Sequence, residues 1–218
     1  MSVRYASIPL TEVKPEIPTR IIFSGSHCTG KTTLYNWLHN ESGRTYYHVK
    51  EHPITWATFR PEPIRVIKCL GFDINKDAGD ASQLAMAAYH MQTLTHADFV
   101  ADRCIVDVLA YAEYIHEHNE YLVTKKTINF INELVEDFLI SFEGVIFFCR
   151  PIEGEKIKDD GLRDLDEDFR ADIDRRLYDL WTQPQFTAVQ RASVYTVSEP
   201  NFLDRTALVK DVLTMKAN

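Results

Sequence analysis

The chain has 218 residues, of which 45% are hydrophobic and 26% charged, with a formal net charge of −8. This length and composition are typical of one globular domain, and no apolar run is long enough to cross a bilayer. The acidic charge disfavours a nucleic-acid partner without excluding a local basic groove, and the four scattered cysteines favour a reducing, cytoplasmic compartment over a zinc or disulfide framework.

The first 19 residues are expected to form an extended arm. They contain Pro9, Pro15 and Pro18, and proline at this density disfavours a helix. The rest of the chain has no internal repeat and no low-complexity linker. We therefore expect an arm over residues 1–19 and a single domain over residues 20–218.

A phosphate-binding motif opens the domain. Residues 25–32 read GSHCTGKT and fit the pattern G-x-x-x-x-G-K-[ST]. A strand is expected at 20–24 and a helix at 32–38, which is the context that this motif requires. The N–H groups of such a loop face an anion at a helix N-terminus, where the partial charge is positive. Lys31 is expected to reach the β and γ phosphates, and the Thr32 hydroxyl to hold Mg²⁺.

A second strand is expected at residues 45–50, beside the strand that precedes the phosphate loop. Glu51 follows it and is a candidate catalytic carboxylate, because open α/β sheets bind ligands at the carboxyl ends of their strands. The alternative is a solvated loop side chain. Residues 55–59 are aromatic, and a helix is one interpretation of them, before Arg60-Pro61-Glu62-Pro63 breaks the chain.

Residues 82–96 form a strong helix pattern, with apolar residues at helical spacing. Gln83 on this helix is a candidate to face a ligand, against the alternative of a side chain at the edge of the core. A third strand at 98–101 leads into Asp102 and Arg103, an acid–base pair at its carboxyl end. Asp107 then opens a helix, where it is a candidate substrate contact or only complements the helix dipole.

The remaining elements complete a parallel sheet. An amphipathic helix is expected at 127–142, an uninterrupted apolar strand at 144–149, a last strand at 193–197 and a closing helix at 204–215. The charged stretch between them, about 153–176, is expected to be a helical lid, or alternatively a solvated helix. Five strands separated by helices predict an α/β fold of three layers, with a five-stranded parallel sheet covered by helices on both faces.

Four segments together resemble the P-loop nucleoside and nucleotide kinases. The first is GSHCTGKTT; the second, Glu51-His52-Pro53-Ile54-Thr55-Trp56, is similar to the Glu-Pro-x-x-x-Trp segment of deoxynucleoside kinases. The third, Asp102-Arg103-Cys104, resembles the Asp/Glu-Arg-Ser and Asp-Arg-Tyr motifs of deoxynucleoside and thymidylate kinases. The fourth, Asp160-Gly161-Leu162-Arg163, is similar to the lid of small phage or bacterial kinases of the nicotinamide riboside kinase type.

This resemblance implies a mechanism and a set of residues. Glu51 would accept the proton of an attacking hydroxyl, Asp102 would help the metal or the acceptor, and Arg163 would close over the transferring group. The implied catalytic residues are Lys31, Glu51, Asp102, Arg103 and Arg163, and the metal residues are Thr32 and Asp102. The implied substrate residues are Glu51, Trp56, Gln83, Arg103 and Asp107. ATP would be bound by Gly25, Ser26, His27, Cys28, Thr29, Gly30, Lys31, Thr32 and Thr33.

The function expected from the sequence is therefore an ATP- and Mg²⁺-dependent kinase of a nucleoside or nucleotide, in deoxynucleotide metabolism, with a homodimer left open. One alternative is a kinase acting on a hydroxyl in a polynucleotide, such as a hydroxymethylated base, which the acidic charge disfavours. Another is a P-loop ATPase without a small-molecule acceptor. A GTPase would need an Asn-Lys-x-Asp stretch, which the chain lacks.

Overall fold

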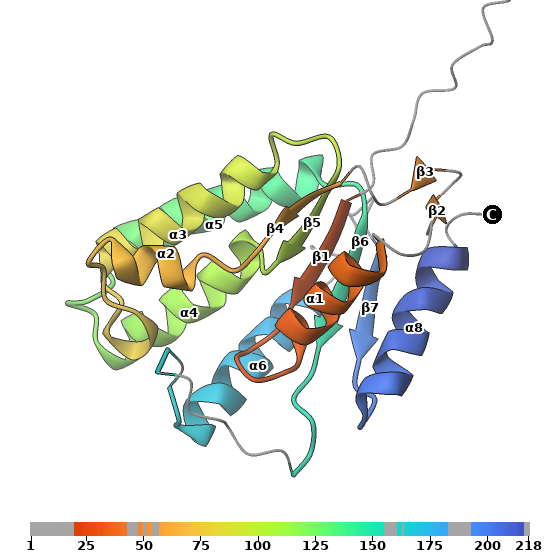
Figure 1. Cartoon of the computed structure of the whole chain (residues 1–218). Coiled ribbons are helices and arrows are strands. Elements are labelled where there is room, and N and C mark those ends of the chain that lie inside the picture. The colour runs from red at the N-terminus through yellow and green to blue at the C-terminus, as the bar shows by residue number, and fades with distance from the viewer. Residues whose placement is uncertain are drawn as a thin grey trace, which may run out of the picture.

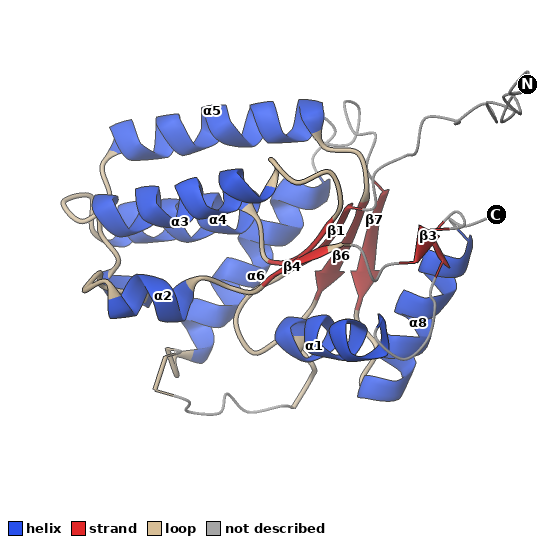
Figure 2. Ribbon diagram, turned by 45° about the horizontal axis from the view of Figure 1, so that its top comes forward, coloured by secondary structure: helices blue, strands red, loops and turns tan. Residues whose placement is uncertain are grey.

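The computed structural model describes residues 20–42, 48–49, 52–53, 57–154, 161–162, 164–182 and 193–215. In this part of the chain, a five-stranded sheet lies between two layers of helices (Figures 1 and 2). The helices are α1 Lys31–Ser42, α2 Ile64–Cys69, the short 3₁₀ helix η2 Asn75–Asp77, α3 Asp80–Thr93, α4 Ile105–His118, α5 Lys125–Ser141, α6 Glu167–Thr182 and α8 Phe202–Met215.

The central sheet is parallel throughout. Its strands are β4 Thr58–Arg60, β5 Phe99–Asp102, β1 Arg20–Ser24, β6 Val145–Cys149 and β7 Ser193–Val197, in that spatial order. The strand that leads into the phosphate loop, β1, is therefore central, with β5 and β6 as its neighbours. Because all five strands run the same way, the residues that follow them meet at one edge of the sheet.

Both faces of the sheet are buried under helices. Along β1, Ile21 and Phe23 pack with α1 and α8, whereas Ile22 faces the opposite side and packs with α4, α5 and α6. Burial on two faces explains why the strands are nearly continuous apolar runs rather than alternating ones. Within the described ranges, no helix has the length and apolarity that crossing a bilayer requires.

The predicted fold class is confirmed, and most elements lie where the sequence places them. The strands at 20–24 and 193–197 have the predicted bounds. The strand predicted at 98–101 lies one residue later at both ends, and the one predicted at 144–149 begins one residue later. The helix predicted at 82–96 begins and ends two to three residues earlier, as α3. These elements carry strong local signals, which are long apolar stripes or uninterrupted apolar runs.

The second strand was predicted wrongly. His48–Val49, the described part of that segment, forms β2, which pairs antiparallel with β3 at His52–Pro53 in a separate two-stranded sheet. The edge of the central sheet is β4 instead, pairing with β5, and its residues overlap the segment 55–59 that was interpreted as a helix. The expected position of Glu51 beside the phosphate-loop strand therefore loses its basis, and Glu51 itself lies outside the described residues.

The charged segment predicted as a lid is described in three parts, residues 153–154, 161–162 and 164–176. From Glu167 onward it belongs to α6, whose apolar stripe is buried in the core and packs against α4. The stripe consists of Phe169, Ile173, Leu177 and Trp181, all at most 2% exposed. One face of α6 is therefore part of the domain core, and the lid over 153–176 stays a prediction.

Candidate active site

The phosphate loop connects β1 to α1 in a conformation that needs glycine at both ends. Gly25 has a φ of 144°, and a Cβ there would lie 2.3 Å from the Cys149 carbonyl oxygen. Gly30 has a φ of 80°, in the region that favours glycine. Cys28 also has a positive φ, of 56°. The loop is thus wound tightly against the end of β6, as a cradle of backbone N–H groups for phosphate requires.

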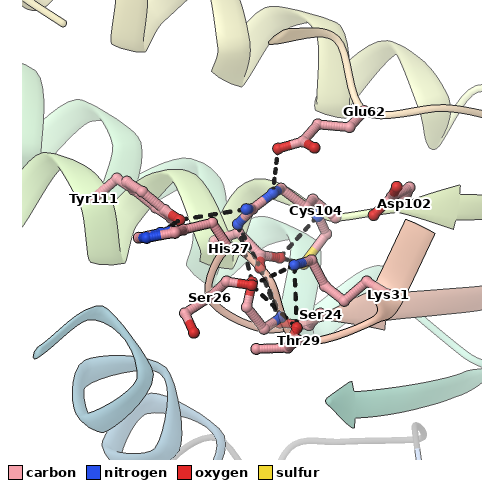
Figure 3. Close-up of polar contacts among 12 residues, drawn as sticks. Ser24, Ser26, His27, Thr29, Lys31, Glu62, Asp102, Cys104 and Tyr111 are labelled. Carbon is pink, nitrogen blue, oxygen red and sulfur yellow. Dashed lines mark hydrogen bonds and ion pairs between the residues drawn. The ribbon is translucent and has the colours of Figure 1, made fainter. Parts of the chain in front are cut away.

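Lys31 is the buried cation of the loop. Its side chain is 4% exposed, and Nζ donates to the Ser26 carbonyl oxygen and, over 3.3 Å, to Thr29 Oγ1 (Figure 3). Burial, with the nearby charge of Arg103, lowers the pKa of Lys31 to about 8. A nearby anion would stabilise the charged form of Lys31, so a buried cation at this position fits the proposed role in phosphate binding.

Thr32 and Asp102 lie together where a metal ion would be held. The Thr32 hydroxyl donates to Asp102 Oδ2 over 2.6 Å, although the two residues are 70 positions apart. Asp102 Oδ1 is buried and has no hydrogen-bond partner in the described part of the chain, and burial together with the charge of Glu62 raises the pKa of Asp102 to about 6. A carboxylate with an unused oxygen beside a threonine hydroxyl fits the donor set of Mg²⁺ in P-loop proteins.

Arg103 joins the phosphate loop to the edge strand of the sheet. It has a φ of 77°, and its buried guanidinium donates from Nη1 to the Gly25 carbonyl oxygen over 2.9 Å. Nε donates to Glu62 Oε1 over 2.5 Å, and Figure 3 draws this contact as a dashed line from the Glu62 carboxylate. Glu62 follows β4, so this ion pair brings a carboxylate from the carboxyl end of the edge strand to the loop.

Asp107 supports the loop from the start of α4. Its Oδ1 accepts from the Gly25 backbone N–H over 3.0 Å and from the Ser24 hydroxyl over 3.2 Å. Its Oδ2 accepts from the Cys104 backbone N–H over 2.9 Å, which caps the helix. The side chain is 1% exposed. These contacts describe an aspartate that caps α4 and ties it to the phosphate loop, whereas its predicted contact with substrate stays a prediction.

A cavity of about 310 Å³ opens beside the loop. Its walls come from the loop, α1, the segment 61–66 with α2, η2, α3 and the start of α4, and many of them are apolar. Gln83 and His90 lie on it from α3, two turns apart, and both side chains are buried. Burial lowers the pKa of His90 to about 4, so this imidazole is neutral. An apolar slot with a few polar groups is typical of a site for a small organic ligand.

The structure brings most of the predicted residues to this one place. Thr32, Gln83, Asp102, Arg103 and Asp107 all lie on the cavity, next to the phosphate loop. Glu51, Trp56 and Arg163 lie outside the described residues, so their predicted roles stay predictions. Three further residues of the site were not assigned a role from the sequence, namely Glu62, His90 and Tyr111. For Glu62 a signal was present, since a carboxylate precedes a proline directly after a short β-prone stretch.

A parallel sheet with a glycine-bounded phosphate loop after β1, and with Thr32 of α1 bonded to Asp102 at the end of β5, defines the P-loop nucleotide-binding fold of the kinase-like type. A profile of the AAA domain family matches residues 20–196, which is most of the chain, and the chain belongs to that family. No curated protein matches the sequence at a significant level.

Solved kinase structures share this fold. A NadR protein in complex with NR has a TM-score of 0.63 and 17% identity over 92% of this chain, which spans only 52% of that protein. Deoxyadenosine kinase from M. mycoides has a TM-score of 0.58 and 13% identity, covering 90% of this chain and 99% of its own. Thymidylate kinase from Ehrlichia chaffeensis has a TM-score of 0.53 and 17% identity, with 90% and 97% covered. The predicted likeness to nucleoside and nucleotide kinases is thus confirmed for the fold.

Proposed function

We propose that this chain is a kinase that transfers the γ-phosphoryl group of ATP to a hydroxyl group of a nucleoside. The observation that carries this proposal is Glu62, whose carboxylate is held by Arg103 on the cavity that also contains Thr32 and Asp102. An alcohol must lose its proton as it attacks, so a hydroxyl acceptor gains from a carboxylate within reach. A phosphate acceptor is already an anion and needs no such base.

The charges of the cavity favour a neutral acceptor. Among the described residues on its wall, two carry guanidinium groups, Arg65 and Arg103, and four carry carboxylates, Glu62, Asp73, Asp102 and Asp107. Arg103 already has carboxylate and carbonyl partners. A dianionic monophosphate would meet more negative than positive charge here, whereas a nucleoside brings none. The likeness in fold to a deoxyadenosine kinase and to a NadR protein in complex with NR is consistent with such an acceptor.

Each residue of the site has a role in the proposed transfer. The loop amides and Lys31 bind the phosphates of ATP, Thr32 and Asp102 hold Mg²⁺, and Mg²⁺ when bound neutralises charge on the phosphate oxygens. Glu62 accepts the proton of the acceptor hydroxyl. At the same time the hydroxyl oxygen bonds to the γ-phosphorus, and the bond between the γ-phosphorus and ADP breaks. Arg103 orients Glu62 and places a positive charge beside the transferring group. Gln83 contacts the acceptor from α3.

A substrate panel tests this proposal. Labelled ATP with Mg²⁺ is offered with nucleosides, nucleoside monophosphates and oligonucleotides, and we expect transfer to nucleosides only. Glu62→Gln keeps the size of the side chain but cannot take the proton, so kcat should fall by about 10²-fold or more while ATP affinity is unchanged. Lys31→Ala should abolish transfer, and Glu133→Gln on the exposed side of α5 is the matched control.

Two results would contradict the proposal. In the first, the protein transfers phosphate to nucleoside monophosphates, and Glu62→Gln does so at the wild-type rate. The acceptor would then be a phosphate and not a hydroxyl. Hydrolysis of ATP that no acceptor on the panel stimulates would favour the ATPase alternative. The proposal also includes a cytoplasmic compartment and a place in deoxynucleotide metabolism, and it leaves a homodimer open.

A further inference from the structure

His27, in the middle of the phosphate loop, is a buried histidine whose side chain has no role in the mechanism above. Its side chain is 5% exposed, and its ring lies 5.4 Å from the ring of Phe169 on α6, centroid to centroid. Its Nδ1 atom lies 3.3 Å from the hydroxyl oxygen of Tyr111 on α4. Figure 3 places His27 between Tyr111 and the loop residues Ser26 and Thr29.

The hydrogen bonds of Tyr111 determine which nitrogen of His27 carries the proton. Arg103 Nη2 donates to the Tyr111 hydroxyl over 3.3 Å, and a guanidinium can only donate. The hydroxyl therefore accepts from Arg103 and keeps its own proton to donate. Its other partner is His27 Nδ1, which must be the acceptor if that proton is to be paired. In a neutral imidazole with Nδ1 as acceptor, the proton is on Nε2.

The surroundings keep this imidazole neutral. Burial, and then the positive charges of Arg103, Lys31 and Arg170, lower the pKa of His27 to about 3, and Asp164 opposes them only in part. Nε2 is thus a neutral N–H donor. It is buried without a hydrogen-bond partner in the described part of the chain. An unpaired buried donor is costly, and such groups are typically retained for a ligand or a catalytic role.

The location of His27 indicates what that ligand is. His27 shares the wall of the cavity with Thr32, Asp102, Arg103 and Glu62, where the terminal phosphoryl group of ATP would meet the acceptor. We propose that His27 is a phosphoryl-binding residue, whose Nε2–H donates to an oxygen of the transferring phosphoryl group. Tyr111 is then a positioning residue that fixes the required tautomer. This inference rests on the proposed function for the identity of that group.

The tautomer can be tested without any activity. In protein labelled with ¹⁵N-histidine, the two-bond correlations of His27 should have the pattern of an Nε2–H tautomer with an unprotonated Nδ1. The Nε2–H signal should shift when AMP-PNP with Mg²⁺ is added, and much less with ADP and Mg²⁺, because only the former has a third phosphate. An Nδ1–H tautomer, or equal shifts with both nucleotides, would overturn the inference.

Two substitutions then separate the two nitrogens in turnover. The amide of a glutamine reaches the position of Nε2, whereas that of an asparagine reaches only the position of Nδ1. We expect His27→Gln to keep most of kcat, and His27→Asn to lose about 10- to 100-fold in kcat with little change in the KM of ATP, as for one hydrogen bond to a charged group. His96→Asn, in the loop after α3, is the control.

A double-mutant cycle tests the part of Tyr111. Tyr111→Phe should lower kcat in the wild-type background and lower it less in the His27→Asn background, because the tautomer no longer matters there. Equal rates for His27→Gln and His27→Asn, or strictly additive losses in the cycle, would overturn the role of His27. A wild-type chain that transfers phosphate to no nucleoside would instead contradict the proposed function, and the tautomer would still be measured.

Discussion

At the scale of single residues, burial fixes the charge of several groups around the cavity. His90 is 5% exposed, and burial lowers its pKa to about 4, so it is neutral in the folded protein at pH 7. In the unfolded chain it would titrate at about 6.5. Between these two values the unfolded state binds more protons than the folded state, so this histidine favours unfolding as the pH falls from 6.5 to 4.

The predicted consequence is that His90→Gln makes the protein less sensitive to acid. At pH 7.5 its stability should be close to or below that of the wild type, because a buried polar side chain was replaced. As the pH is lowered, the free energy of unfolding of the variant should rise relative to that of the wild type, by up to about 3 kcal/mol at pH 4. Thermal unfolding of both proteins from pH 7.5 to 4 measures this, with His96→Gln as control. Parallel curves would mean that His90 titrates normally.

The candidate site could be predicted where a residue type and a spacing together specify a chemistry. The phosphate loop has a fixed pattern, and the acidic end of a buried strand pointed to Asp102, which the structure brings to Thr32. Glu62 could not be found with the same assurance. Glu51 and Glu62 both follow a short β-prone stretch near a proline, and only the pairing of β4 with β5 distinguishes them.

At the scale of elements, three side chains of the segment 68–76 bind residues 161, 162, 164 and 166 beside the cavity. Asn75 Nδ2 donates to the Leu162 carbonyl oxygen over 2.7 Å, and Lys68 Nζ to the Gly161 carbonyl oxygen over 2.9 Å. Lys76 pairs with Asp164 over 3.2 Å and with Asp166 over 3.0 Å. Asn75 and Leu162 both line the cavity, so these contacts close one of its sides.

We therefore predict that Asn75→Ala weakens acceptor binding. Losing one hydrogen bond should raise the KM of the acceptor by about five- to tenfold, with the KM of ATP unchanged, since Asn75 does not contact the phosphate loop. Asn132→Ala is a matched control, because Asn132 also donates a side-chain hydrogen bond, to Glu136, but on the exposed face of α5. A rise in the KM of ATP alone would contradict this assignment.

The elements that sequence reasoning missed are the ones held by distant partners. β4 has three residues and one neighbouring strand, and β2 and β3 have two residues each. Such short segments carry no periodicity, and local β propensity at residues 45–50 was as strong as at 58–60. The choice between them is made by hydrogen bonds to β5, some 40 residues further along the chain, which no local pattern records.

At the scale of the whole molecule, one buried arginine connects the two ends of the domain. Arg205, near the start of α8, is 1% exposed and donates to three backbone carbonyl oxygens. Nη1 donates to Thr29 in the phosphate loop over 2.5 Å, Nη2 to Arg150 after β6 over 2.9 Å, and Nε to Glu199 over 2.6 Å. The planar fork of arginine suits this geometry better than the single ammonium of lysine.

Arg205→Met should therefore affect both stability and nucleotide binding. It leaves buried carbonyl oxygens without their donor, which typically costs about 1–3 kcal/mol for each group left unpaired. We expect a lower unfolding temperature. We also expect at least a tenfold weaker affinity for ATP, because Arg205 donates to the Thr29 carbonyl oxygen of the phosphate loop. Arg205→Lys should recover only part of either loss. Calorimetry of unfolding and of ATP binding measures both, and unchanged ATP affinity in a destabilised variant would limit Arg205 to a role in folding.

The position of Arg205 in the sequence has a consequence for the synthesis of the protein. The phosphate loop ends at Thr32, and Arg205 is synthesised 173 residues later. At 5–20 residues per second this delay is roughly ten to thirty seconds. During that time the nascent chain has the complete phosphate-loop sequence without the side chain that donates to the Thr29 carbonyl oxygen of the loop. We therefore expect ATP to bind more weakly to chains in which α8 has not yet docked than to chains in which it has.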